Sequence, residues 1–74
     1  MTTLQIEKTK TAWTGVADTL YVPHSERQYR RLVNLLDGLV DEIGENEQHP
    51  LASLMEVVGV LIEKYEDENV PVLN

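Results

Sequence analysis

Apolar residues recur every three or four positions along two long segments of this chain. Such spacing places side chains on one face of an α-helix. Pro50 suits the first helical turn, and Pro71 disfavours helix beyond about residue 70. The second of these segments is therefore predicted to be a helix over about 50–68, with an apolar face made of Leu51, Leu54, Met55, Val58, Leu61, Ile62 and Tyr65.

The first of the two segments is predicted to be a helix over about 25–44. Ser25 and Gln28 have the spacing of a capping box, and Gly44 is a typical helix terminator. The loop to the next helix is short, so the two helices should pack as an antiparallel hairpin. The apolar face of this helix is predicted to comprise Tyr29, Leu32, Val33, Leu36, Val40 and Ile43.

The N-terminal region has a weaker pattern. Residues 1–7 lack regular spacing and are expected to be loose, whereas residues 8–20 are compatible with a short helix that contains Gly15 and several threonines. Trp13 is expected to anchor this helix to the rest of the fold. The predicted fold is all-α, with a hairpin (about 25–44 and 50–68), a short N-terminal helix (about 8–20) and one small helical interaction domain over residues 1–74.

The apolar faces of the two long helices are wider than a hairpin alone can cover. Leu35 and Val57 extend each face to about 160°, whereas about 100° is enough for one neighbour. The excess must contact the N-terminal helix, a second copy of the chain or another protein. The chain is expected to form a homo-oligomer through this excess, and the candidate association residues are Leu35, Leu39, Val57, Val60 and Leu61. A place in the hydrophobic core is the alternative for each of them, and for Leu39 and Leu61 the two interpretations are equally favoured.

Composition and charge limit the classes of function and partner that suit the chain. Thirteen acidic and six basic residues give a formal charge of −7, which disfavours direct binding to nucleic acid. The same charge suits a basic partner, although it also simply favours solubility. The chain contains no cysteine, no signal peptide pattern and no membrane-length apolar run, so a cytoplasmic location is expected.

Few residues have a spacing that suggests catalysis or metal binding. His24, Ser25 and Glu26 include the residue types of a hydrolytic triad, but adjacent side chains at a helix start diverge, so Ser25 is better interpreted as a cap. His24 and His49 are interpreted as residues that flank or cap helices. No catalytic residue, cofactor or metal ligand is assigned, and the protein is not expected to be an enzyme.

Two carboxylate pairs and one arginine cluster are the remaining candidates. Glu42/Glu45 and Glu63/Glu66 have the spacing by which helical carboxylates hold Mg²⁺. Helical geometry places Glu63 and Glu66 away from the apolar face, which favours a solvated surface. An all-α Mg²⁺-dependent nucleotide pyrophosphohydrolase stays as an alternative. The cluster Arg27, Arg30 and Arg31 could bind an anionic partner.

Residues 12–71 resemble the N-terminal domain of HigA-type antitoxins, which are helix-turn-helix transcriptional regulators. The resemblance rests on the opening Ala12-Trp13, on a first helix with Tyr and an LLD-L-DE pattern, and on a second helix that ends close to LI--YE-E--P. The matching residues of the two helices are Tyr29, Leu35, Leu36, Asp37, Leu39, Asp41 and Glu42, then Leu61, Ile62, Tyr65, Glu66, Glu68 and Pro71.

The resemblance implies a non-catalytic module that binds and neutralises a basic mRNA-cleaving toxin of the HigB type. In that family a DNA-binding domain follows the final proline, whereas this sequence stops at Asn74, so no helix-turn-helix domain is expected in it. A stand-alone module, a remnant of a split gene and a piece of a longer chain all remain open. The first alternative function is a stand-alone homodimerisation module without a toxin partner.

Overall fold

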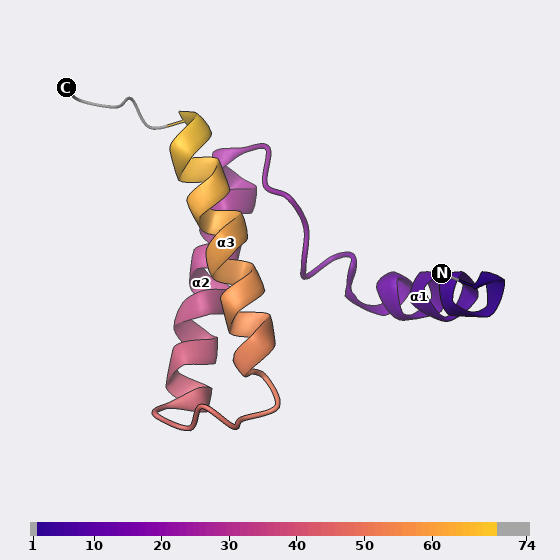
Figure 1. The fold of residues 1–74 in the computed structure, drawn as a ribbon. Coiled ribbons are helices and arrows are strands. Elements are labelled where there is room, and N and C mark those ends of the chain that lie inside the picture. Colours follow the sequence, from indigo (N-terminus) through magenta and orange to yellow (C-terminus); the bar gives the residue numbers. More distant parts are fainter. Residues whose placement is uncertain (1, 70–74) are drawn as a thin grey trace.

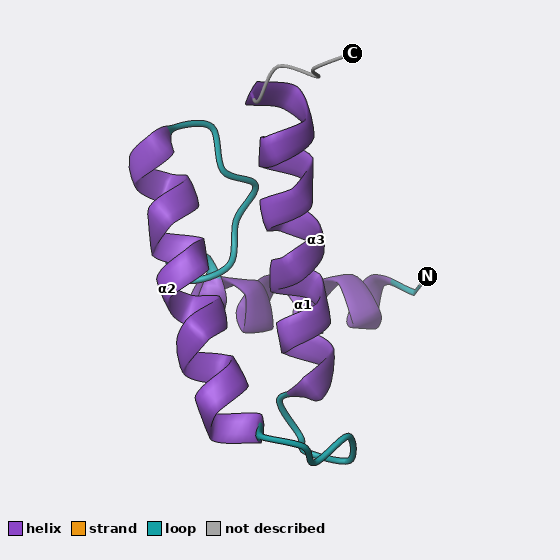
Figure 2. Cartoon of the chain, turned by 90° about the vertical axis from the view of Figure 1, so that its left-hand side faces the viewer, coloured by secondary structure: helices purple, strands orange, loops and turns teal. Residues whose placement is uncertain are grey.

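The computed structural model describes residues 2–69, which form three α-helices and no strand. The helices are α1 (Thr3–Val16), α2 (Glu26–Ile43) and α3 (Ala52–Asn69). Helices α2 and α3 lie side by side as a hairpin, while α1 projects sideways from it (Figures 1 and 2). The all-α fold with a helical hairpin is therefore confirmed. The predicted role of Pro71 lies outside the described residues.

The hydrophobic core lies between α2 and α3. Its buried side chains are Leu32, Leu39, Ile43, Val58 and Ile62, and half-buried neighbours surround them. At one end of the hairpin the rings of Tyr29 and Tyr65 stack, with their centroids 4.8 Å apart. The core positions are seven and four residues apart on α2 and four apart on α3, and this spacing keeps them along the line where the two helices meet.

Two residues expected on the buried faces are instead exposed. Val40 is 50% exposed because α3 packs along the line of Leu39 and Ile43, and Val40 lies one position, about 100°, further around α2. Leu51 is exposed because α3 begins later than predicted, at Ala52, so that Leu51 lies in the preceding turn.

Local hydrogen bonds explain where the hairpin helices begin and end. The Ser25 hydroxyl accepts a bond from the Gln28 amide (3.2 Å), which confirms the predicted cap. The return bond differs from a capping box, because the Gln28 side chain accepts from the His24 amide (2.7 Å). Gly44 has a φ of 59° and ends α2 as expected. His49 Nδ1 accepts a bond from the Leu51 amide (3.1 Å) just before α3.

The N-terminal helix differs most from the prediction. It begins at Thr3 rather than about residue 8, because Thr2 and Gln5 form a complete capping box. It ends at Val16 and packs against neither α2 nor α3. Trp13 is 48% exposed and does not anchor α1 to the hairpin.

The connector between α1 and α2 does the anchoring instead. Leu20 and Tyr21 pack against the hairpin core, and Pro23 is buried. The Tyr21 hydroxyl donates a hydrogen bond to the Gln28 carbonyl (3.2 Å). The connector therefore covers part of the apolar excess that the sequence left without a neighbour.

A hydrogen bond across the hairpin makes its stability sensitive to alkaline pH. The Tyr29 hydroxyl donates to Glu66 Oε2 (2.7 Å), and this bond, with smaller contributions from desolvation and the Glu66 charge, raises the pKa of Tyr29. A raised pKa contributes stability that is present below the unfolded-state pKa of about 10 and is lost as pH rises through the folded-state value. We expect the denaturant midpoint to fall above about pH 10 in the native protein, and to fall less in Tyr29→Phe. Equal pH profiles for the two proteins would contradict this assignment.

Candidate protein-interaction surface

The outer face of α3 carries exposed apolar side chains. Val57 is 45% exposed and Val60 is 62% exposed, and half-buried Leu61 lies beside them. These three residues line one shallow hollow with Ser53 and Glu56. Because α3 is a regular helix, residues three and four apart meet on its surface, and the three side chains form one continuous apolar face. This set, Val57, Val60 and Leu61, is called the α3 face below.

The five predicted association residues fall into two groups. Val57, Val60 and Leu61 are brought together in the α3 face, and half-buried Leu61 also packs against the hairpin core. Leu39 is only 6% exposed and lies in the hairpin core, while Leu35 is half-buried against that core. Leu35 also lines a separate hollow beside the connector, together with Asp18, Thr19, Tyr21 and Arg31.

The outer side of α2 presents a second mixed surface. Asp37, Val40 and Asp41 are all exposed, and their spacing of three and four places them next to one another on the helix. An exposed apolar side chain between two carboxylates can contact an apolar group of a partner while the carboxylates attract basic groups around it. Sequence reasoning had assigned Val40 to the core and therefore missed this set, which is called the α2 patch below.

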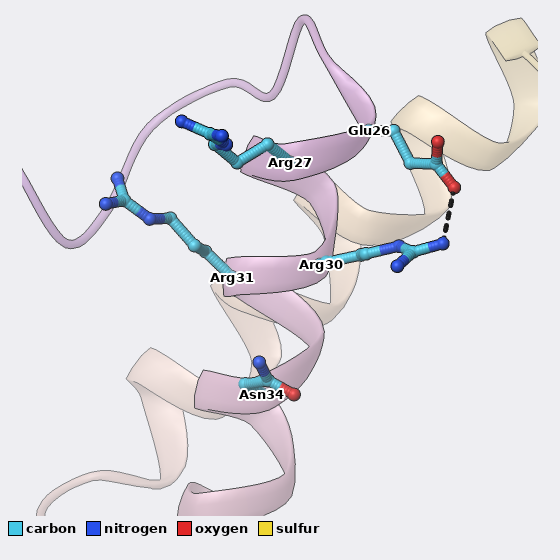
Figure 3. Close-up of a pocket in the computed structure, with 5 residues that line it drawn as sticks. All are labelled: Glu26, Arg27, Arg30, Arg31 and Asn34. Atoms are coloured by element: carbon cyan, nitrogen blue, oxygen red, sulfur yellow. Dashed lines mark hydrogen bonds and ion pairs between the residues drawn. The ribbon is translucent and has the colours of Figure 1, made fainter.

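The arginine cluster is divided between two sides of α2. Figure 3 shows Arg27 and Arg31 extending to one side and Arg30 to the other, above Asn34. Arg30 pairs with Glu26 (2.8 Å), as the i, i+4 spacing suggests, but both side chains are largely exposed and the pair adds little stability. The three guanidinium groups do not converge on one point.

The carboxylate pairs are not arranged like a metal site. Within residues 2–69, no group of three or more histidine, aspartate and glutamate side chains is placed to hold a metal ion. The prediction that Glu66 points into solvent was wrong, because Glu66 is half-buried and accepts the Tyr29 hydrogen bond. Its position about 100° from Tyr65 brings it to the edge of the interhelical contact.

Charge is unevenly distributed along the chain. Residues 32–69 contain ten acidic residues and one basic residue, Lys64, whereas residues 2–31 contain three acidic and five basic residues. Lys64 itself pairs with Glu68 (2.6 Å), and that lysine holds the pKa of the Glu68 carboxyl below its usual value. Most of the hairpin is therefore strongly acidic, and the N-terminal third is slightly basic.

Helix α1 adds further exposed apolar side chains, including Trp13, which was expected to anchor the helix to the rest of the fold. Ile6, Trp13 and Val16 are all exposed, as is every other residue from Thr3 to Val16. The sequence signal that predicts the early start of α1 is the capping-box spacing of Thr2 and Gln5, which lies before the predicted helix at about 8–20.

None of the helices within residues 2–69 is long and apolar enough to cross a bilayer. The fold and its surface define a small all-helical domain with exposed apolar side chains and an acidic hairpin. Comparison with family models gives the family: residues 5–73 match the N-terminal domain of the HigA antitoxin, and the chain belongs to that family. No curated protein and no solved structure matches the chain.

Membership confirms the resemblance seen in the sequence and extends it to residues 5–11, within α1. The family is a non-catalytic one, with the antitoxin and transcription-regulator role of toxin–antitoxin systems.

Proposed function

We propose that this domain acts in the cytoplasm as an antitoxin module that binds a basic, mRNA-cleaving ribonuclease toxin. The observation that carries the proposal is the charge of the hairpin, which has ten acidic residues and one lysine over residues 32–69. A surface that binds RNA is basic, so an acidic helical surface can attract it and cover it. The family assignment supports this partner class.

The α2 patch is the proposed contact with the toxin. Val40 supplies an exposed apolar side chain, and Asp37 and Asp41 flank it on the same side of the helix. Contacts of this kind combine an apolar anchor with charges that accelerate association and select the partner.

The test is light scattering coupled to size exclusion, with the protein alone and then mixed with the small basic protein encoded beside it. We expect the measured mass to rise on mixing by one mass of that protein for each copy of the 8.4 kDa chain. Affinity should fall steeply with salt, because screening weakens attraction between exposed charges.

A charge-matched pair of variants locates the contact. Asp37→Lys with Asp41→Lys should weaken toxin binding roughly tenfold or more, since close interfacial charge pairs contribute at least about 1.5 kcal/mol. Glu45→Lys with Glu47→Lys makes the same change of net charge in the loop and should have a much smaller effect. Equal losses would indicate net charge alone, and no mass shift with the native protein would refute the antitoxin proposal.

A second candidate function, homodimerisation, is favoured by the exposed α3 face. We propose that the domain also self-associates through Val57, Val60 and Leu61, with the toxin bound on the other helix. In that arrangement the two surfaces are independent, so a dimer of the domain can bind two toxin molecules.

A further inference from the structure

Helix α1 is a complete helix whose residues from Thr3 to Val16 are all exposed. It does not pack against α2 or α3, and Figure 1 shows it projecting away from the hairpin. An isolated helix of 14 residues is marginal in water, and threonine and glycine weaken it further. Its helical form is therefore best explained by packing on another surface.

The side chains of α1 define which face would pack. Ile6, Thr9, Trp13 and Val16 are spaced three, four and three residues apart, so they form one stripe along the helix. The hydroxyl within this stripe is already satisfied, because the Thr9 side chain donates to the Gln5 carbonyl (2.8 Å). The stripe can therefore be buried against an apolar surface without leaving a hydroxyl unpaired.

The charges beside the stripe indicate an acidic partner. Helix α1 carries Glu7, Lys8 and Lys10, and it is therefore slightly basic. A basic ribonuclease is the wrong partner for these lysines. The hairpin is acidic and therefore has the complementary charge. Its α3 face is apolar and is bordered by Glu56, so it can pack against the apolar stripe while the glutamate attracts the lysines.

Docking onto the hairpin of the same chain is disfavoured by the connector. The amides of Thr19 and Leu20 both donate to the Val16 carbonyl (2.9 Å each), and Leu20 and Tyr21 are packed on the core. The direction of α1 is thus fixed within a few residues of an anchored point. Folding back onto α3 of the same chain would break these contacts.

We infer that α1 is an exchanged arm, whose stripe packs on the α3 face of a second copy of this chain. The α1 helix of each copy packs on the α3 face of the other copy, which is the reciprocal arrangement of a two-fold symmetric dimer. The inference rests on the self-association proposed above and specifies which element covers the α3 face.

The absence of cysteine from the chain allows a direct test with the full-length protein. Two single variants, Thr9→Cys and Val60→Cys, are mixed and treated with a bismaleimide that spans about two helical turns, about 11 Å. Each chain has one thiol, so a link between the two variants must be intermolecular. We expect the mixed species to be the main cross-linked product when isotope labelling of one variant identifies it by mass.

The matched control is Thr11→Cys mixed with Val60→Cys, since Thr11 lies on the opposite side of α1 from the stripe. This pair should cross-link at least several-fold less. The fluorescence of Trp13, the single tryptophan, is a second readout that does not depend on the register of packing. Its emission should shift to shorter wavelength as protein concentration rises and dimers form.

The outcomes distinguish the exchanged arm from the proposed self-association on which it rests. A dimer by light scattering whose two cysteine pairs cross-link equally, with no shift of Trp13 emission, would overturn the exchanged arm and leave self-association intact. A monomer at all concentrations would overturn both.

Discussion

Replacing Leu32 with alanine is expected to remove most of the stability of the domain. Leu32 is fully buried between α2 and α3, and truncating its isobutyl side chain to a methyl group leaves a cavity that costs about 2–5 kcal/mol. A domain of this size has a total stability of about 5 kcal/mol, so the variant should lose most of its folding free energy. Circular dichroism at 222 nm during urea titration measures the loss as a fall in the denaturation midpoint.

The control for Leu32→Ala is the same substitution at Leu4. Leu4 is 66% exposed and lies on α1, away from the stripe, so its replacement should change stability by no more than about 0.5 kcal/mol. Similar midpoints for the two variants would mean that Leu32 does not lie in the cooperative core.

Replacing both Val57 and Val60 with glutamate is expected to dissociate the proposed dimer. Two carboxylates would be desolvated against the apolar side chains of the facing α1 stripe, which is costly for assembly. The dissociation constant should rise by about 100-fold or more, because each factor of ten requires only about 1.4 kcal/mol. Helicity should remain, since both side chains are exposed in the folded chain. Analytical ultracentrifugation and circular dichroism measure the two effects.

A matched double variant separates a local effect from a general effect of charge. In this control variant Val22 and Val40, which are about as exposed as Val57 and Val60, are replaced with glutamate. Its net charge equals that of the Val57/Val60 variant. This variant should keep the dissociation constant of the native protein. If it dissociates equally, net charge and not the α3 face controls assembly; if the Val57/Val60 variant loses its helicity, those side chains belong to the core.

The acidic hairpin and the α1 arm are proposed to act through charged contacts with two different partners. The hairpin charge is proposed to attract a basic toxin, while the lysines of α1 are proposed to attract the hairpin of a second copy. Both interactions depend on exposed charges and should weaken with salt, whereas the apolar contacts of the stripe and the α3 face should not.

The sequence determined the fold of the hairpin because local and global signals agreed there. Apolar spacing, the Ser25 cap and Gly44 all predicted the limits of α2, and Tyr29 to Ile43 have the periodicity of a buried face. The family pattern was also readable from the two helices, and the family match covers the residues that carried it.

The sequence also determined that the apolar faces were too wide for two helices, but it could not say which residues would be left exposed. Periodicity gives the direction of a side chain only to within about one position, or 100°. Val40 and Leu39 are adjacent, and only the line of contact with α3 decided that Leu39 is buried and Val40 exposed. The same contact drew Glu66 to the hydrogen bond with Tyr29.

Only the tertiary structure decided the place of α1. The chain has one tryptophan, and burial in the domain is the usual expectation for such a side chain. That expectation failed because Leu20 and Tyr21 in the connector fill the position beside the core that Trp13 was expected to occupy. A sequence records which side chains favour burial, but the packing of neighbouring segments decides whether that burial takes place within one chain.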